Sequence, residues 1–537
     1  VNEIKSTKLS MVPLAKGGSM KVYEKTTEIA PYAFNRSVVE EIIVPASVET
    51  VGSNAFDTCS NLKRVVFENA EDAKPLTLGK TAFKSCGKLE EVTLPARLTA
   101  SNYELVVDKK STYLIKDVEY KMDFDLSIFT SCSSLNRVNV EGTYDKAAYT
   151  SIDGILYSAD GKKLIYCPRG RTEAVTTNKA VTIGSAAFYG CSKIEKVEIG
   201  APVTTIDEFA FAECSAVNDL TFKGTKDYNA LTIKFGAFLN NKMLTEVTLP
   251  ENLSSMDTCA FGGTALLKTV TLNSVGENGK VNFADGVFGS NSKNNPSYYV
   301  QTVMLGEKTP AFGIASVFGN KIISFTVSEN NANYTKGEKD EYYGSYTDAS
   351  GATRNMLVYV PSYYSGEFVV KAGTNEICAN TFSGNVKIES VVIPASVEKI
   401  GAAAFNGASN LVKVTFEADK EGGATALEIS NNAFYQCSNL SGNIVFPARL
   451  TSIGEKAFCN TRKITGITFT GTKLTSIGES AFQWCERITA VTLPEGLVSI
   501  GKSAFSGCEA LDSFTISSTV TEIGEDMLSN AELLTTV

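Results

Sequence analysis

One pattern of apolar and polar positions recurs along most of the chain. From Ile477 to Pro494, apolar residues stand at offsets 0, 4, 5, 8 and 11, and apolar and polar residues then alternate through Leu493. The first spacing is typical of one face of a short helical stretch, and the alternation is typical of a β-strand. Pro494 lacks a backbone N–H and ends the predicted strand. Each repeat therefore predicts a helical turn followed by a short strand.

A phenylalanine occupies the same position in successive repeats, usually directly after an alanine. Sixteen of the 29 phenylalanines stand at this position, mostly 22–24 residues apart with several intervals of 27–30. A repeat this short cannot bury its apolar side alone, so we expect the repeats to stack and share one core. The predicted buried column, or spine, includes Phe56, Phe83, Phe188, Phe211, Phe405, Phe434, Phe458, Phe482 and Phe505.

The full repeat, I-G-x-x-A-F-x-x-C-x-x-L-x-x-V-x-L-P, resembles the BspA-like leucine-rich repeat of bacterial and protist surface proteins. Good copies are Val51–Phe67, Ile400–Phe416, Ile453–Phe469, Ile477–Pro494 and Ile500–Ile516. The resemblance implies an α/β repeat solenoid, with a parallel β-sheet on the concave face and short helical turns opposite. We expect about 17 coils at ~4.8 Å between neighbouring strands. The resemblance also implies surface display and a binding or adhesive role, but it names no ligand.

Two stretches interrupt the repeat, and both end in a similar apolar pattern that leads to the next spine phenylalanine. In the first stretch, two apolar runs flank Asp160-Gly161, which predicts a β-hairpin. We expect one continuous solenoid with a lead-in over 1–20, repeats over 21–138, a hairpin-bearing interruption over 139–180 (irregular from about 97), repeats over 181–327, a Tyr-rich interruption over 328–376 and repeats over 377–537.

Two groups of side chains are candidates for ligand contact. Fourteen of the 21 tyrosines lie in the two interruptions. Tyrosine offers a large rigid surface with a polar end, so these rings either form part of a binding surface or pack the hairpins against the solenoid. The tyrosine candidates are Tyr342, Tyr343, Tyr346, Tyr363 and Tyr364.

The second group is a column of threonines on the outward side of the predicted strands. Eight coils carry threonine at this position, Thr93 and Thr221 among them, and the candidates are Thr248, Thr271, Thr415, Thr468 and Thr492. A β-branched polar residue also suits any exposed strand. The column is therefore open to a purely structural interpretation as well as to ligand contact.

Catalytic chemistry finds little support in the sequence. The chain has no histidine, which excludes Ser-His-Asp and Cys-His catalysis and histidine metal ligands. Eight of the 12 cysteines stand three residues after a spine phenylalanine, so they are expected to be buried core thiols, whereas Cys167, Cys259, Cys378 and Cys459 lie elsewhere in the pattern. We predict no enzyme activity, no cofactor and no metal site; a carboxylate pair acting as a glycosidase is the third alternative.

The charge and hydropathy of the chain limit the kinds of partner that we expect. Fifty Lys and Arg against 59 Asp and Glu give a formal charge of -9, and the basic residues are scattered, which argues against nucleic acid as a partner. No stretch approaches the ~20 apolar residues of a transmembrane helix. The chain begins at Val1 without a leader, which was either removed or never present. We predict a cell-surface or secreted protein that binds a host or cell-surface protein or a glycan; the alternative is a structural spacer that displays another module.

Overall fold

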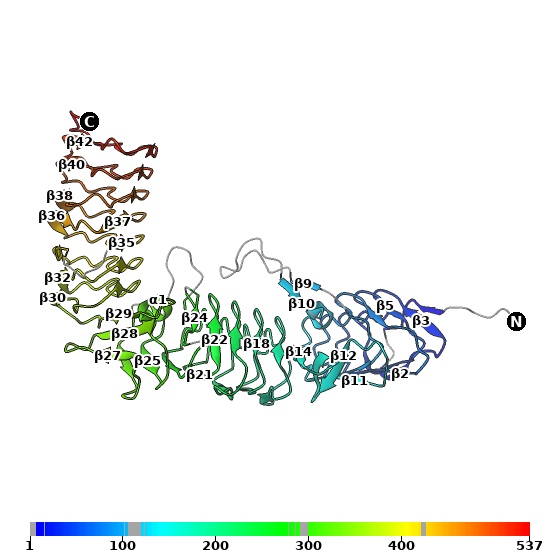
Figure 1. Ribbon diagram of the computed structural model, residues 1–537. Coiled ribbons are helices and arrows are strands. Elements are labelled where there is room, and N and C mark those ends of the chain that lie inside the picture. Colours follow the sequence, from blue (N-terminus) through cyan, green and yellow to red (C-terminus); the bar gives the residue numbers. More distant parts are fainter. Residues whose placement is uncertain are drawn as a thin grey trace. The chain divides into compact units, whose positions relative to one another are not determined.

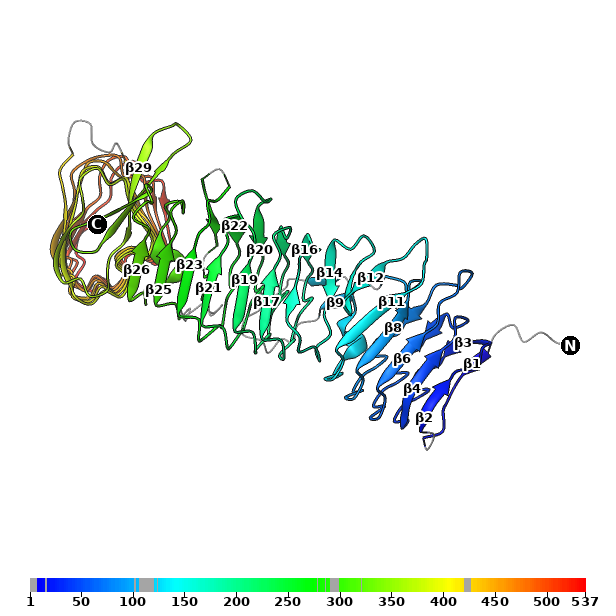
Figure 2. The same ribbon diagram turned by 90° about the horizontal axis from the view of Figure 1, so that it is seen from below.

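The computed structural model describes residues 7–14, 17–100, 103–105, 120–122, 124–277, 279–284, 286–289, 299–319, 321–419 and 426–537. The chain divides into two compact units, Val1–Tyr299 and Val300–Val537. Each unit is a stack of coils in which short strands of successive coils pair in parallel (Figures 1 and 2). The predicted repeat solenoid is therefore confirmed as a parallel-β solenoid with almost no helix.

Each coil contributes to two ladders of parallel strands. The Val-x-Leu ladder contains the strands predicted from the alternating pattern, and the Ile-Gly ladder contains short strands that end at the apolar residue before the repeat glycine. The expected single sheet is thus corrected to two. The second ladder forms where a helical turn was expected, because the residues around that Ile pair with the neighbouring coil instead of with their own segment.

In the first unit, the Val-x-Leu ladder consists of β2 (Gly18–Lys21), β4 (Val39–Val44), β6 (Arg64–Phe67), β8 (Glu91–Pro95) and β11 (Arg137–Glu141), then β15 (Val175–Thr176), β17 (Lys196–Ile199) and β19 (Asp219–Phe222), then β21 (Glu246–Leu249) and β23 (Thr269–Leu272). The Ile-Gly ladder consists of β1 (Thr7–Leu9), β3 (Thr26–Ile29), β5 (Thr50–Val51) and β7 (Thr77–Leu78), then β14 (Lys163–Tyr166), β16 (Thr182–Ile183), β18 (Thr205–Ile206), β20 (Leu231–Ile233), β22 (Leu253–Met256) and β24 (Asn282–Phe283). A separate antiparallel pair joins β9 (Tyr103–Leu105) and β10 (Tyr120–Met122).

In the second unit, the Val-x-Leu strands are β25 (Thr302–Leu305) and β26 (Ser324–Val327), then β30 (Gly366–Val369), β32 (Ile388–Ile393) and β34 (Lys413–Phe416), then β36 (Ser441–Phe446) and β38 (Lys463–Phe469), then β40 (Ala490–Thr492) and β42 (Ser513–Thr515). The Ile-Gly ladder runs without a break through β29 (Thr353–Tyr359), β31 (Glu376–Ile377), β33 (Lys399–Ile400), β35 (Leu427–Ile429), β37 (Leu450–Ile453), β39 (Ser476–Ile477), β41 (Ser499–Ile500) and β43 (Glu522–Ile523).

Both sequence interruptions form antiparallel hairpins that end in a ladder strand. In the first unit, β12 (Tyr149–Ile152), β13 (Ile155–Ser158) and β14 pair in antiparallel order, and β14 then pairs in parallel with β16. In the second, β27 (Tyr334–Lys336), β28 (Tyr342–Thr347) and β29 repeat this arrangement, and β29 pairs in parallel with β31. The hairpin predicted at Asp160-Gly161 is confirmed. The interruptions supply two of the ladder strands, β14 and β29, and the described residues form about 21 turns where about 17 were expected.

The segment around each spine phenylalanine is a series of tight turns and not the expected helical turn. The N–H groups of Asn54, Phe56 and Thr58 donate to carbonyl groups of the next coil at 3.2, 2.8 and 2.8 Å. Asn54 and Thr58 have φ of 57° and 58°, and a left-handed pair four residues apart recurs in most other coils. A left-handed residue ends a right-handed helix, so these short segments bond outward to their neighbours. The described residues contain one α-helix, α1 (Ile314–Phe318), and one 3-10 helix, Leu126–Phe129.

The glycine of the repeat is required by close packing of the coils. A Cβ atom on Gly401 would lie 2.5 Å from the backbone nitrogen of Ala379 in the preceding coil. Gly501 has the same relation to Glu479, at 2.3 Å. A backbone neighbour cannot move aside as a flexible side chain can, so only glycine fits here.

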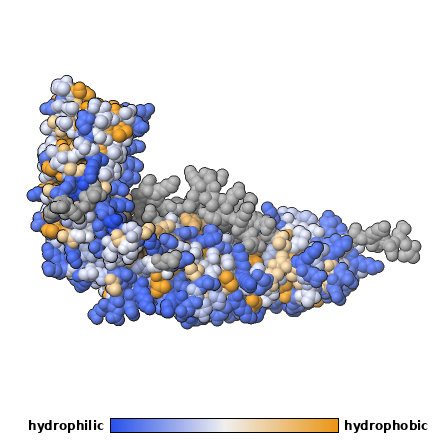
Figure 3. Space-filling model, in the orientation of Figure 1, coloured by the Kyte–Doolittle hydropathy of each residue, from blue (hydrophilic) through white to orange (hydrophobic). Residues whose placement is uncertain are grey.

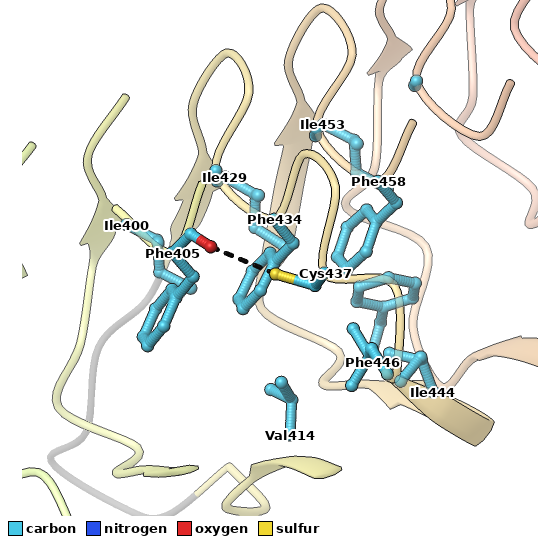
Figure 4. Packing of buried hydrophobic residues seen from close by; sticks show 14 of the residues in the cluster. Ile400, Phe405, Val414, Ile429, Phe434, Cys437, Ile444, Phe446, Ile453 and Phe458 are labelled. Atoms are coloured by element: carbon cyan, nitrogen blue, oxygen red, sulfur yellow. Dashed lines mark hydrogen bonds between the residues drawn. The ribbon is translucent and has the colours of Figure 1, made fainter. Parts of the chain in front are cut away.

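The phenylalanine spine is the centre of the core in each unit. All nine predicted spine residues are 0–1% exposed. Their rings stack between coils, for example Phe56 on Phe83 at 4.7 Å between centroids and Phe405 on Phe434 at 4.8 Å, each with an angle of 3° between the ring planes. Figure 4 shows Phe405, Phe434 and Phe458 in consecutive coils with the isoleucines of the Ile-Gly ladder beside them.

The cysteines form a ladder of buried free thiols. All twelve are free and buried. Seven of the eight thiols that stand three residues after a spine phenylalanine donate to the carbonyl of the spine phenylalanine one coil earlier, as from Cys59 to Phe34 at 3.0 Å and from Cys437 to Phe405 at 3.1 Å (Figure 4). The small apolar thiol fills the core and also satisfies a buried carbonyl group.

Replacing one internal spine residue tests how far the stacked rings stabilise the fold. We expect Phe434→Ala to lower the free energy of unfolding by about 3–5 kcal/mol, because it removes a fully buried ring between two stacked neighbours. Urea denaturation followed by circular dichroism measures the change. The matched control is Val412→Ala in the same unit, whose side chain is 47% exposed and should cost little. Equal losses for the two variants would contradict a buried spine.

The thiol ladder predicts a pH dependence of stability. Burial raises the pKa of Cys259 to about 11 and that of Cys485 to about 12. Unfolded thiols ionise near pH 8.5, so above this pH only the unfolded state loses its thiol protons and the free energy of unfolding should fall as pH rises. Below pH 8.5 the stabilisation that comes from keeping the buried thiols protonated is fully present.

A thiol-reactive chromogenic disulfide should label no cysteine of the folded protein at pH 8 and all twelve in guanidinium. Rapid labelling of the folded protein would contradict the burial of the thiols.

Candidate functional site

A groove on the surface of the second unit lies where the second hairpin meets the strand ladder. The groove, of about 810 Å³, is lined on one side by the end of β27, with Lys336, and by the turn between β27 and β28, with Lys339 and Glu341. The opposite side consists of Tyr364 and residues of β30, with Phe368 and Val369 among them. We call this feature the hairpin groove. It lies in the Tyr-rich interruption from which five contact candidates were predicted.

Three of those five tyrosines are mainly structural. Tyr342, Tyr343 and Tyr364 are 9%, 7% and 6% exposed. Tyr342 packs edge-on against Phe325 with 4.8 Å between ring centroids, and Tyr364 packs on Phe368 at 5.0 Å. Their rings hold the hairpin against the coils, as the packing alternative anticipated. Tyr343 and Tyr364 still line the groove with their remaining exposed surface.

The other two tyrosines are more accessible. Tyr363 is 54% exposed and donates from its hydroxyl to a carboxylate oxygen of Asp340 at 2.7 Å. Tyr346 is half-buried in the outer part of β28, and burial raises the pKa of its phenol. Neither of the two lines the hairpin groove. The sequence therefore located the region of the groove and two tyrosines that line it, Tyr343 and Tyr364, but it did not distinguish them from the other three candidates.

The edge of β30 that faces the hairpin has no strand partner among the described residues. On its other edge β30 pairs with β32, and the N–H groups of Gly366 and Val370 donate to that side. The open side is partly satisfied by tyrosine hydroxyls. Tyr364 donates to the carbonyl of Glu367 at 2.7 Å, and the N–H of Lys371 donates to the hydroxyl of Tyr343 at 3.2 Å.

Two lysines place positive charge at this open edge. The Lys339 ammonium donates to the Tyr364 hydroxyl at 2.9 Å and lies 5.1 Å from the centroid of that ring. The Lys371 ammonium lies 5.8 Å from the centroid of the Tyr343 ring. The hydrogen bond to Tyr364 raises the pKa of Lys339, and burial raises the pKa of Tyr343 to about 12, so the Lys339 ammonium is charged and the Tyr343 phenol is neutral at physiological pH.

The carboxylates around the groove are mostly engaged elsewhere. Glu341 accepts from the backbone N–H of Lys339 at 3.0 Å and so belongs to the hairpin turn. Glu367 accepts from the Ser390 hydroxyl of β32 at 3.5 Å, on the side away from the open edge. Lys336 is paired with Asp340 at 2.6 Å. Glu338 also lines the groove, and Glu341 and Glu338 lie close enough to Lys339 to attract its ammonium group, so both acidic and basic groups lie beside the edge of β30.

The threonine column largely faces outward, as predicted. Thr248, Thr468 and Thr492 are exposed, while Thr271 and Thr415 are half-buried. Thr93 is a correction, because its side chain is only 2% exposed in the middle of β8. In the first unit the neighbouring charged residues pair between coils, as in Arg64 with Glu41 at 3.1 Å. Such pairing is a structural use of the face and does not indicate a ligand.

The threonine face of the first unit contains a cavity. β19 and β21 belong to different sheets, and a shallow cavity of about 590 Å³ lies between them. Thr248, Thr221 and Glu246 contribute to its lining. The Thr221 hydroxyl oxygen is buried and has no hydrogen-bond partner among the described residues. This cavity brings one predicted contact residue, Thr248, into a concave site.

No catalytic or metal-binding arrangement accompanies either surface in the part of the chain that the structure describes. No group of three or more Cys, Asp or Glu side chains there could hold a metal ion. A search of the same residues finds no helix with the length and apolar character needed to cross a membrane. On the visible side in Figure 3, apolar residues are scattered between polar ones.

Comparisons with known proteins agree with this architecture. The chain matches the BspA type leucine-rich repeat region, a six-copy family, over residues 16–112, 74–152, 166–288, 368–421 and 425–537. The matched residues cover well over half of the sequence, so the chain belongs to the BspA-type leucine-rich repeat family. No curated protein matches the chain.

Among solved structures, a leucine-rich cell surface protein of Faecalibacterium prausnitzii is 17% identical and covers 100% of this chain and 91% of its own, with a TM-score of 0.25. The T. pallidum leucine-rich repeat protein TpLRR is 23% identical over 36% of this chain and 88% of its own, with a TM-score of 0.31. The pneumococcal vaccine antigen PcpA is 18% identical over 59% of this chain and 84% of its own, with a TM-score of 0.31.

The groove residues outside the tyrosine set were not predicted as contacts. Lys339 lies in a polar turn and Lys371 in a loop, where a charged residue is ordinarily solvated. Alternation in Gly366–Val369 indicates a strand, but it gives no sign that one edge of this strand lacks a partner. Only the placement of the hairpin beside β30 brings these residues together.

The different burial of the tyrosines predicts different effects of truncation. We expect Tyr343→Ala to lower the free energy of unfolding by about 3–5 kcal/mol, because it removes a buried ring from the core. Tyr363→Ala should change it by less than about 1 kcal/mol, since its ring is mostly exposed. Urea denaturation of both variants provides the measurement. If Tyr363→Ala lowered the free energy of unfolding as much as Tyr343→Ala, the exposed ring of Tyr363 would be stabilising the hairpin, contrary to this prediction.

Proposed function

We propose that the chain is a non-enzymatic bacterial binding protein, secreted or displayed at the cell surface, that contacts a protein or glycan ligand. The observation that carries the proposal is the hairpin groove, in which an open strand edge, two ammonium groups and tyrosine surface lie together. Membership of the repeat family and the surface-protein title of one structural neighbour are consistent with it.

The groove has the composition of a recognition site. It combines apolar surface from the exposed Val369 with charged and hydroxyl groups from Lys339, Tyr343 and Tyr364. Apolar surface with a few placed polar groups is typical of ligand sites. It is also the place where the regular repeat is broken, and irregular segments on a rigid scaffold commonly carry binding residues. The threonine face, with Thr248, Thr271, Thr415, Thr468 and Thr492, is proposed as a secondary contact surface.

A binding screen with matched variants tests this proposal. The intact chain is passed over immobilised host matrix proteins and a glycan array by surface plasmon resonance, and bound ligands are retested with Lys339→Ala/Lys371→Ala. We expect at least about a tenfold loss of affinity, since two charge-mediated contacts are removed.

The matched control is Lys387→Ala/Lys413→Ala, which removes the same charge from two exposed positions of the same unit. Its affinity should stay within about twofold of the intact chain, because neither lysine lines the groove. Binding that both variants reduce equally would argue for general charge attraction, against a groove site. Failure of the intact chain to bind any matrix protein or glycan would contradict the proposal and favour a structural spacer.

A further inference from the structure

We propose that the buried guanidinium of Arg97 in the first unit binds a small carboxylate anion, of the size of formate or acetate, through its free Nε and Nη2 groups. This site is separate from the hairpin groove and goes beyond the proposed function. Arg97 follows β8 in the sequence Pro95-Ala96-Arg97-Leu98, and it is 0% exposed. A fully buried charged side chain is ordinarily paired with an opposite charge.

Main-chain groups of the neighbouring coils hold Arg97 at both ends. Its Nη1 donates to the carbonyl of Lys74, in the preceding coil, at 2.8 Å and to that of Val48, two coils earlier, at 2.9 Å. The carbonyl of Arg97 itself accepts from the N–H of Leu76 at 3.0 Å. The orientation of the remaining donors is therefore set before a ligand binds, which lowers the entropy that binding costs.

The remaining donors of Arg97 have no partner among the described residues. Nε and Nη2 are both buried there without a hydrogen bond. Burial lowers the pKa of Arg97 and the charge of Glu49 opposes that shift, but the Glu49 carboxylate is paired with the Lys74 ammonium at 2.9 Å. Arginine stays ionised in proteins, so a positive charge lies here without a bonded counterion. Two free N–H groups on one guanidinium can bind both oxygens of one carboxylate.

The second unit repeats the same motif with a carboxylate in place. Residues 447–450 again read Pro-Ala-Arg-Leu, Arg449 is 2% exposed, and its carbonyl accepts from the N–H of Leu427 at 2.8 Å, as in the first unit. The Arg449 guanidinium donates to the carbonyl of Glu417 at 3.1 Å and to a carboxylate oxygen of Asp419 at 2.8 Å. The buried guanidinium of this motif is therefore built to take a carboxylate.

The first unit lacks the side chain that supplies this carboxylate. Asp419 stands three residues after the end of β34, and the residue three after the end of β6 is Ala70. The neighbouring Glu71 and Asp72 are exposed, and neither bonds to Arg97 among the described residues. A free carboxylate can take the place of the missing side chain.

The loop that carries Ala70 allows a small ion to enter. Among the described residues, the segment 69–73 makes no main-chain hydrogen bond to another coil, whereas Glu68 donates to the carbonyl of Val44 at 2.8 Å and the Lys74 carbonyl accepts from Arg97. A loop held only at its ends opens at low cost in free energy. Because Arg97 is fully buried when the loop is closed, the anion must be small.

Thermal unfolding of the intact chain in different anions tests the proposal. Sodium formate replaces sodium chloride at constant ionic strength and neutral pH, and circular dichroism gives the unfolding midpoint. We expect formate to raise the midpoint by at least about 2 °C, because an anion that binds only the folded state stabilises it. Equal midpoints in formate and chloride would overturn the proposal. An equal rise in sodium phosphate would overturn the assignment to a carboxylate.

Three variants separate this site from a general effect of the salt. Arg97→Met removes the charge and should abolish the rise in formate, whereas the matched control Arg449→Met should keep it. Ala70→Asp supplies a carboxylate from the loop, so we expect a higher midpoint in chloride and no further rise in formate. An undiminished rise in Arg97→Met would overturn the proposal. Should Arg97→Met fail to fold, an undiminished rise in Ala70→Asp would overturn it equally.

Discussion

Stacking of phenylalanine rings from successive coils is the interaction on which the rest of the structure depends. No coil can enclose its own apolar side, so the ring of each coil is buried only because the next coil covers it. Centroid distances of 4.6 Å for Phe382 and Phe405 and 4.8 Å for Phe405 and Phe434 match the spacing of paired strands. The rings and the backbone ladders therefore impose the same repeat distance, and neither is strained to suit the other.

Several other features follow from that common spacing. The repeat glycine is needed because a coil one strand-spacing away leaves no room for a Cβ atom at Gly401. The turn segments bond to their neighbours because the acceptors of the next coil are within reach at every second residue. The cysteine thiol bonds the carbonyl of a spine phenylalanine for the same reason. The repeat glycine, the left-handed pair of each turn segment and the cysteine thiol are thus all consequences of the spacing between neighbouring coils.

The hairpin groove exists because this regularity is interrupted. The hairpin of β27, β28 and β29 keeps the Ile-Gly ladder continuous through β29, but β30 lies in a different sheet from β26. In the part of the chain that the structure describes, one edge of β30 has no strand partner, and it lies beside Lys336 at the end of β27 and Lys339 in the following turn. Tyr364 packs edge-on against Phe368, which in turn packs edge-on against Phe382 at 5.0 Å between centroids, so the groove is joined to the spine by aromatic contacts. A rigid core thereby supports a surface that is open to a partner.

Local patterns were enough to establish the repeat, the spine and the burial of the ladder cysteines, because each depends on neighbours at a constant sequence interval. The hairpin at Asp160-Gly161 was also predictable, since its turn and strands are contiguous. The helical turns were predicted wrongly because the spacing of Ile477, Phe482 and Cys485 fits a helix as well as a turn series whose bonds go to another coil. Local patterns did not predict three features: the second ladder, the burial of Tyr343 and Tyr364, and the open edge of β30. Each of these depends on which segment lies beside which, and that is decided only when coils and hairpins pack together.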